Sequence, residues 1–417
     1  MQIIMNIRKF NYYFLIYLSL LFFFGIFWLY TKHLVGNDST ISEWLINYQG
    51  GFTKRGLVGE ICFRIAKYFD LSLRFVIFLF QSLIYSIFLV LIYRFFKNTS
   101  ANLIIIFSIF TPIFLLYPIA EVEVLARKET FVFIAFLLFL NISSFNYSNN
   151  LSLYYVFFIL PIICLIWEPV IFFFPFILSV LIIRLRNNQI LSLCSKIIVC
   201  FIPALVVSWI IATNPITSEN HLIMANSLKE NFGEDCTWVA CGRLLIVSSI
   251  KDQFMGIATL YSLEVFVRYF LIILIGFGPI FLLNFNTKLK IKVLFFRHFN
   301  NLFYPILIIL SPVLILFAMG ADWGRWVNIS YTFTALFYFY LLKNNYIEIN
   351  LKKIDKIIFL FKNKLLKNKK TLLILCFIIY AFGWNPKTVT TGDVASIPGY
   401  RIPYKSIKML YYQIKNN

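Results

Sequence analysis

The sequence predicts an all-α, polytopic integral membrane protein. Hydrophobic residues make up 60% of the chain and aromatic residues 19%, whereas charged residues make up 13% and the mean hydropathy is +0.82. Soluble domains carry about twice that charged fraction. A helix that crosses a bilayer needs about 20 apolar residues, and about eleven runs reach or approach that length. We therefore expect a single transmembrane domain over residues 1–417.

The net charge of +20 raises the question of a polyanionic partner. In membrane proteins, lysine and arginine collect in cytoplasmic loops and face anionic lipid. The sequence contains no GxGxxG, GxxxxGK[ST], HExxH or GxSxG motif, each of which marks a soluble type of active site. We therefore expect contact with the lipid bilayer and no nucleic-acid partner.

The first predicted span is about Tyr12–Tyr30, preceded by Arg8 and Lys9. This run is longer than the apolar region of a signal peptide, which has about 7–15 residues, and basic residues before a span favour a cytoplasmic amino end. The later predicted spans are about Leu73–Phe96, Asn102–Tyr117, Phe131–Phe145, two spans within 151–186, Lys196–Ala212, Leu263–Leu283, Leu302–Met319, Val327–Leu342 and a short Thr371–Trp384.

Residues 151–186 are interpreted as two spans joined by a turn at Trp167-Glu168-Pro169. A single helix of this length would exceed about 45 Å at 1.5 Å per residue, against a hydrocarbon core of about 30 Å. Two spans also keep the later basic clusters, Lys288–Arg297 and Lys343–Lys370, on the cytoplasmic side, as the positive-inside rule requires.

This topology divides the polar segments between the two faces. Of the 18 acidic residues, Glu348 and Asp355 fall in the cytoplasm, and the others fall outside or near the outer surface. Chemistry at the outer face is one explanation, and longer outer loops are the other. The segments are a first outer loop 31–72, a second outer loop 119–130, a long outer segment 213–260, an outer DWGRW turn 320–326, a basic cytoplasmic loop 343–370 and a C-terminal tail 385–417.

The first outer loop combines acids, cations and glycines. Asp38 and Glu43 are candidate proton acceptors, and Lys54 with Arg55 forms a cationic pair in GGFTKRG. The acids also fit the start of a short helix, where negative charge favours the helix dipole. The cations also fit contact with lipid headgroups.

The second outer loop carries Glu121-Val-Glu123 followed by Arg127 and Lys128. Oxygen ligands from an acid-x-acid pair suit a divalent cation, and the two cations suit phosphate oxygens. An ion pair between Glu123 and Arg127, four residues apart on a helix, is the structural alternative.

Two further places concentrate polar groups. Glu168, beside Pro169 in an apolar stretch, is a functional candidate because ionisable residues are costly near lipid. Asp322, Trp323, Arg325 and Trp326 suit binding of a sugar phosphate, with the indoles stacking on the sugar. Tryptophans at this depth also form ordinary interfacial belts.

Cys236 and Cys241 lie five residues apart in the long outer segment. In an oxidising compartment a disulfide-closed loop is expected, and two free thiols are the alternative. The three histidines, His33, His221 and His298, are scattered in sequence, which gives no indication of a histidine metal site.

A cytoplasmic amino end, an acid-bearing first outer loop, the Glu121-Val-Glu123 motif between the third and fourth spans, and the many spans together resemble the GT-C membrane glycosyltransferases. NYQGGFTKRGL and DWGRW are also similar to segments of membrane proteins from bacterial surface-polysaccharide loci. The chain departs from GT-C enzymes in having no large soluble carboxy-terminal domain and no DxD or ExD directly after the first span.

The resemblance implies an enzyme of the bacterial inner membrane that acts in cell-surface polysaccharide biosynthesis. Its substrates would be a lipid-linked sugar donor of the polyprenyl-phosphate type and a glycan or lipid acceptor. Asp38 or Glu43 would be the general base. Glu121 and Glu123 would hold Mg²⁺ or Mn²⁺ or orient the acceptor. Arg127, Lys128 and Arg325 would stabilise the phosphate leaving group of an inverting displacement.

Two other functions fit the same pattern. A polysaccharide polymerase of the O-antigen or capsule type would depend on outer arginines such as Arg55 and Arg325 more than on an acid. A lipid-linked sugar flippase would carry charges deep in its spans and inverted repeats, neither of which is evident in the sequence.

Overall fold

A computed structural model describes residues 6–34, 39–144, 148–186, 190–237, 239–246, 250–291, 293–360, 363 and 370–390. The fold is nearly all helical in these residues. The helices are α1 (Ile7–Leu34), α2 (Ser39–Leu45), α3 (Gly56–Tyr68), α4 (Leu73–Phe96), α5 (Leu103–Ile109), α6 (Tyr117–Ala120), η1 (Val122–Val124), α7 (Glu129–Ile142), α8 (Asn149–Ile166), η2 (Glu168–Phe173), α9 (Phe174–Arg184), α10 (Ile190–Thr213), α11 (Ser218–Phe232), α12 (Val239–Ile246), α13 (Ile250–Ala258), α14 (Leu263–Phe285), η3 (Leu294–His298), α15 (Phe303–Leu310), η4 (Ser311–Val313), α16 (Leu314–Met319), α17 (Trp323–Lys343), α18 (Leu351–Leu360) and α19 (Lys370–Phe382).

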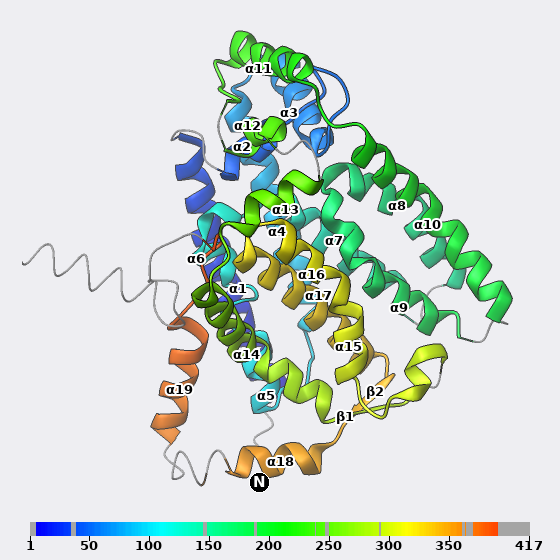
Figure 1. Ribbon diagram of the computed structural model, residues 1–417. Helices are drawn as coiled ribbons and strands as arrows, with labels where there is room; N and C mark the ends of the chain where they lie inside the picture. The colour runs from blue at the N-terminus through cyan, green and yellow to red at the C-terminus, as the bar shows by residue number, and fades with distance from the viewer. Residues whose placement is uncertain are drawn as a thin grey trace, which may run out of the picture.

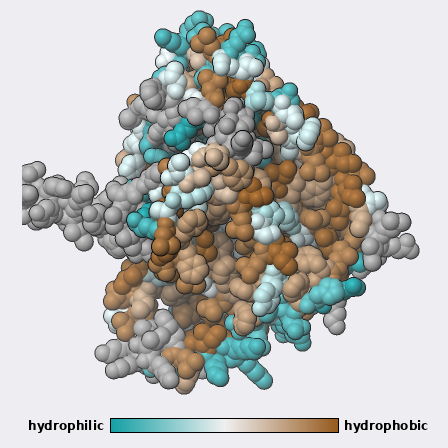
Figure 2. Space-filling view, viewed as in Figure 1, coloured by the Kyte–Doolittle hydropathy of each residue, from teal (hydrophilic) through white to brown (hydrophobic). Residues whose placement is uncertain are grey.

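Five of these helices are long and apolar enough to cross a bilayer: α1, α4, α8, Ser192–Thr213 of α10, and α14. Shorter apolar helices occupy Glu129–Ile142, Phe303–Met319 and Lys370–Phe382. Apolar side chains cover a broad outer surface over the middle of the molecule in Figure 2. The prediction of a helical, multi-pass membrane protein is thereby confirmed, and the count of about eleven spans stays a prediction.

The helices form a bundle (Figure 1) whose upper and lower ends in this view are hydrophilic (Figure 2). The upper end in this view is made by α2, α3, α11 and α12, and the lower end by α18 and a small antiparallel ladder of β1 (Thr287–Leu289) and β2 (Ile347–Ile349). α17 runs through the interior, where every residue from Trp323 to Leu341 is buried. The turn before α3 and the start of α17 both meet α2 of that end, because Glu43 pairs with Arg55 and lies 3.7 Å from Arg325.

The predicted break at Trp167-Glu168-Pro169 coincides with an interruption of the helix. α8 ends at Ile166, Glu168–Phe173 forms a 3₁₀ turn, and α9 begins at Phe174. Proline at the start of each of the two later elements explains the interruption, because proline has no amide hydrogen to donate to the preceding turn. Glu168 is therefore placed on a turn.

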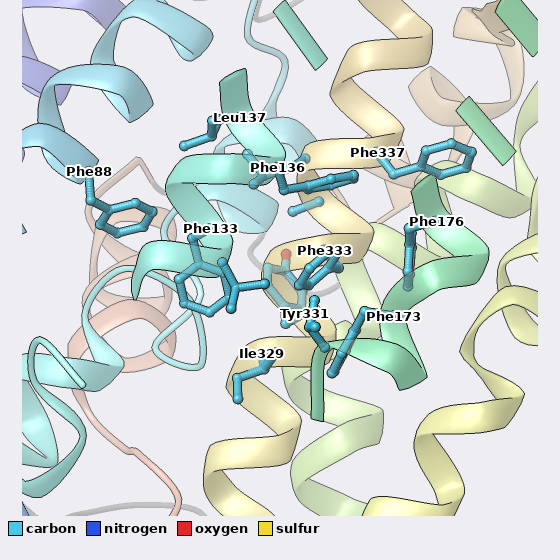
Figure 3. Close-up of a cluster of buried hydrophobic side chains, with 14 of the residues drawn as sticks. Phe88, Phe133, Phe136, Leu137, Phe173, Phe176, Ile329, Tyr331, Phe333 and Phe337 are labelled. Atoms are coloured by element: carbon cyan, nitrogen blue, oxygen red, sulfur yellow. The ribbon is translucent and has the colours of Figure 1, made fainter. Parts of the chain in front are cut away.

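Aromatic side chains of α7, η2, α9 and α17 pack together next to this turn (Figure 3). The ring centroid of Phe333 on α17 lies 4.6 Å from both Phe136 of α7 and Phe173 of η2. Phe176 of α9 packs edge-on against Phe337, with centroids 5.8 Å apart. This packing fixes α7, η2 and α17 relative to one another, and each of these elements contributes a charged side chain to the upper end.

The first loop depends on close backbone contact between α2 and α3. A Cβ atom added to Gly59 would lie 1.9 Å from the carbonyl oxygen of Ile46 and 2.6 Å from that of Trp44. Glycine is the residue that permits this approach. The same turn holds Arg55, the residue before α3, at a left-handed φ of 64°, which costs about 1–3 kcal/mol in a non-glycine residue.

Gly59→Ala should lower the free energy of unfolding by about 1–3 kcal/mol, the usual cost of overpacking, because two carbonyl groups would have to move. The measurement is denaturant unfolding of purified protein in mixed micelles. Gly278→Ala is the matched control, since a Cβ there meets no atom within 4 Å. Equal stability of the two variants would contradict the proposed close packing.

Candidate functional site

Charged side chains from five separate segments converge at the upper end of the bundle. They come from α2, the turn before α3, the start of α7, the turn η2 and the start of α17. We call this set the ionic cluster. Its members are Glu43, Lys54, Arg55, Arg127, Lys128, Glu129, Glu168, Asp322 and Arg325.

Glu43 lies at the centre of the cluster and is fully buried. Its Oε2 accepts a hydrogen bond from Nε of Arg127 at 2.7 Å, and its Oε1 accepts one from Nη1 of Arg55 at 3.1 Å. Nη2 of Arg325 lies 3.7 Å from Oε1. Three guanidinium groups therefore share one carboxylate, which joins α2 to the turn before α3, to the segment before α7 and to α17.

Arg55 links this centre to the turn η2. Its Nε and Nη2 donate to the two oxygens of Glu168, each at 2.8 Å, a bidentate pair of the kind that arginine forms best. The ammonium of Lys128 donates to the carbonyl oxygen of Arg55. Lys128 thus stabilises the left-handed turn that aims Arg55 at both carboxylates.

Arg325 forms the other side of the cluster. Nε and Nη2 donate to the carboxylate of Glu129 at 2.8 and 2.9 Å, and Nη1 donates to Asp322 at 3.3 Å. The side chains of Arg325 and Glu129 are each 2% exposed, whereas that of Asp322 is 26% exposed. Asp322 therefore lies at the accessible edge of the cluster.

Burial and mutual attraction shift the ionisation of this site. Burial opposes ionisation of Glu43, but attraction by Arg127, Arg325 and Arg55 outweighs it, so the pKa of Glu43 lies below its usual value. Burial lowers the pKa of Lys128 to about 8 despite the nearby Glu43. Glu43 is consequently an ionised structural carboxylate at neutral pH and a weak proton acceptor.

Lys54 differs from the other cations of the cluster. Within the described residues, no hydrogen bond or ion pair engages its ammonium, although Glu168 lies close enough to raise its pKa by attraction. Burial is the larger influence and lowers the pKa of Lys54. A partly desolvated cation without a partner is well suited to accept an anionic ligand.

The Glu121-Val-Glu123 motif is divided by the fold. The carboxylate of Glu121 accepts hydrogen bonds from Asn385 at 3.2 Å and from the hydroxyl of Thr388 at 3.2 Å, whereas Glu123 is exposed. Arg127 pairs with Glu43 instead of Glu123. In this arrangement the two acids do not form a shared oxygen site, so the proposed function assigns no role to a divalent cation at this motif. Asp38, the other predicted base, lies outside the described residues.

The two tryptophans of the DWGRW turn are buried. Trp323 donates from Nε1 to the carbonyl oxygen of Phe317 at 2.7 Å and packs against Tyr261 and Tyr269. Trp326 contacts the guanidinium of Arg325, 5.3 Å from the ring centroid. Neither ring is free to stack on a sugar in this arrangement, and that role stays a prediction.

Cys236 and Cys241 form a disulfide. With His221 they make up the one set of at least three possible metal-ligating side chains found in the described part of the chain. The amide of Cys241 donates to the hydroxyl of Ser42 at 2.9 Å. The disulfide loop is thereby attached to α2, beside Glu43.

Sequence reasoning did not select Glu129 as a site residue. The residue follows Arg127 and Lys128 directly, and its partner Arg325 lies 196 positions away. The sequence did indicate that Glu129 needs a cationic partner, because it is an acid at the predicted outer end of a span, where a buried charge requires one. Nothing in the sequence indicated which of the outer arginines that partner is.

Comparison of the chain with protein-family models, with curated proteins and with solved structures found no match. The function is therefore inferred from the ionic cluster and its position in the bundle.

Proposed function

We propose that this protein is a membrane-embedded glycosyltransferase that moves a sugar from a polyprenyl-phosphate-type donor to a glycan or lipid acceptor. The observation that carries the proposal is the charge balance of the ionic cluster. Five cations face four carboxylates, and the uncommitted cation is Lys54. The excess positive charge at the end of an apolar bundle suits a phosphate whose hydrocarbon tail stays in the bilayer.

In this proposal Lys54 and Arg55 bind the donor phosphate. The side chain of Arg55 is 19% exposed, so it is partly accessible while Glu168 and Glu43 hold the guanidinium in place. The buried Arg127 and Arg325 add fixed positive potential behind it. As the bond to the sugar breaks, negative charge grows on the leaving phosphate, and preorganised cations stabilise that charge.

Asp322 is the proposed general base, in place of Glu43. Its side chain is the most accessible of the four carboxylates, and its one ion pair, to Arg325, is the longest hydrogen bond of the cluster at 3.3 Å. It can accept the proton of an acceptor hydroxyl without leaving a buried guanidinium unpaired, because Glu129 still neutralises Arg325. Asp38 remains the second candidate base.

We place the ionic cluster at the outer face of a bacterial inner membrane. The lysine-rich α18 and the β1–β2 ladder lie at the opposite end of the bundle (Figure 1), and cytoplasmic loops are the ones enriched in lysine and arginine. The three shorter apolar helices, together with α5, α9 and α17, would complete a topology of about eleven spans.

The test uses purified protein in proteoliposomes with polyprenyl-phosphate-linked sugars extracted from host membranes. Glycan products are identified by mass spectrometry. Wild-type protein should form a transfer product, and Asp322→Asn should lower the initial rate by about 10²–10⁴-fold, the usual contribution of general acid–base catalysis. Asp355→Asn, at the opposite end of the bundle, is the matched control and should leave the rate unchanged.

A polysaccharide polymerase is the second candidate, and one observation favours it. Three of the four cluster carboxylates are held in close pairs with arginine, which leaves arginines as the dominant chemical feature. If Arg55→Lys abolishes product formation while Asp322→Asn and Asp322→Ala retain it, the polymerase replaces the transferase. Absence of any product with wild-type protein, accompanied by movement of lipid-linked sugar between leaflets, would favour a flippase and contradict both enzymes.

A further inference from the structure

We propose that the lower end of the bundle binds the headgroups of anionic lipids through a defined surface, the basic rim. The rim consists of Lys288, Lys290, Arg297, Lys352, Lys353 and Lys356, all of them exposed. Two acids, Glu348 and Asp355, lie among these six cations, so the net charge of the rim is strongly positive. This inference does not depend on the proposed enzyme activity.

The position of the rim matches the depth of lipid headgroups. α14, which is long and apolar enough to span a bilayer, ends at Phe285, and β1 begins two residues later at Thr287. Figure 2 shows hydrophilic residues along the lower edge, directly beneath the apolar surface. Cations at that level lie where the phosphates of the adjoining leaflet are concentrated.

The fold holds the rim as one surface. β1 pairs antiparallel with β2, which places Lys288 opposite Glu348. The amide of Asn350 donates to the carbonyl oxygen of Asn286 at 2.9 Å and so fixes the start of α18 beside the end of α14. Ile354 of α18 is fully buried against the bundle. The basic residues of segments 288–297 and 352–356 therefore lie on one surface.

α18 has the residue pattern of a helix at a membrane surface. Lys352 and Lys356 lie one helical turn apart on the face opposite Ile354, and Phe359 and Leu360 are 62% and 42% exposed at the end of the helix. Lysines can reach phosphates while an aromatic ring enters the acyl boundary. A lipid surface uses both kinds of group, since its phosphates bind the lysines and its acyl chains accept the aromatic ring.

The experiment is hydrogen–deuterium exchange of the full chain in nanodiscs of phosphatidylcholine, with or without 30% phosphatidylglycerol. The α18 amides should exchange at least about fivefold more slowly in the nanodiscs that contain phosphatidylglycerol. A fivefold change corresponds to about 1 kcal/mol, the contribution of one lysine near an anionic surface. Raising NaCl to 1 M, where the Debye length is about 3 Å, should remove the difference. Soluble glycerol phosphate added to phosphatidylcholine nanodiscs should not reproduce it.

The variant Lys352→Gln with Lys356→Gln should lose the protection, while the matched double variant Lys67→Gln with Lys229→Gln, exposed on α3 and α11, should keep it. Unchanged exchange in the remaining helices reports that each variant is folded. Equal exchange of wild-type α18 in the two nanodiscs would overturn the proposal. So would protection that survives in the α18 variant, or protection that glycerol phosphate alone provides.

Discussion

Glu43→Gln should destabilise the protein by about 3–5 kcal/mol, the cost of breaking a buried ion pair from one side. The substitution retains the size of the side chain but removes the charge shared by Arg55, Arg127 and Arg325. Arg127 would lose its carboxylate partner while buried, and the desolvation of its guanidinium would no longer be offset. The free energy of unfolding in mixed micelles measures the effect.

Glu348→Gln provides the matched control for this substitution. Glu348 pairs with Lys290 at 3.0 Å, and both side chains are about half exposed or more, so the loss should stay below about 1 kcal/mol. Combining Glu43→Gln with Arg127→Met should recover part of the lost stability, because the orphaned charge is removed as well. A Glu43→Gln variant as stable as wild type would show that the guanidinium groups are solvated and that the cluster is open.

The difference between the pKa of Glu43 in the folded state and in the unfolded state predicts how stability depends on pH. The folded-state pKa of Glu43 lies below its unfolded value because three arginines stabilise the carboxylate more than burial disfavours it. A group with a depressed folded pKa stabilises the protein fully above its unfolded pKa, and that stability is lost as pH falls towards the folded pKa. Glu43 should therefore contribute to stability across neutral pH, and the difference between wild type and Glu43→Gln should shrink only under acid conditions.

The sequence predicted which segments would meet better than it predicted how their residues would pair. Alternation of apolar runs assigned the first loop, the 119–130 segment, Glu168 and the DWGRW turn to one side, and all four contribute to the cluster. Pairing is decided by tertiary distance, which the local pattern does not contain. Thus the partner of Arg127 is Glu43, 84 residues away, and not Glu123, four residues away.

The role of Glu121 shows the same limit of local reasoning. Its spacing from Glu123 suggested a metal site, but its partners are Asn385 and Thr388, more than 260 residues further along the chain. Apolar periodicity is a local property and could assign Glu121 to the end of a span. Only the folded chain brings the segment after α19 against that span.

Lys54→Gln should separate function from stability more clearly than any other substitution in the cluster. The ammonium has no partner among the described residues, so its removal leaves no buried group orphaned, and the free energy of unfolding should change by no more than about 0.5 kcal/mol. If Lys54 stabilises the leaving phosphate, the rate of sugar transfer should nevertheless fall by about 10²–10³-fold, as when one electrostatic donor is removed from an active site. The measurement is the initial rate in proteoliposomes, and Lys67→Gln, an exposed lysine of α3, serves as the control.

The pH profile of transfer distinguishes this role from a structural one. Burial lowers the pKa of Lys54, and only the protonated form attracts phosphate, so the wild-type rate should decline on the alkaline side before an ordinary lysine would titrate. Lys54→Gln should lose most of its activity, and the alkaline decline of the remaining rate should follow Lys128 alone, whose pKa is about 8. A variant that keeps the wild-type rate would exclude Lys54 from donor binding and move the phosphate site to the arginines alone. A variant that fails to fold would mean instead that the ammonium has a structural partner, because an unpaired buried cation destabilises the folded state and its removal cannot do so.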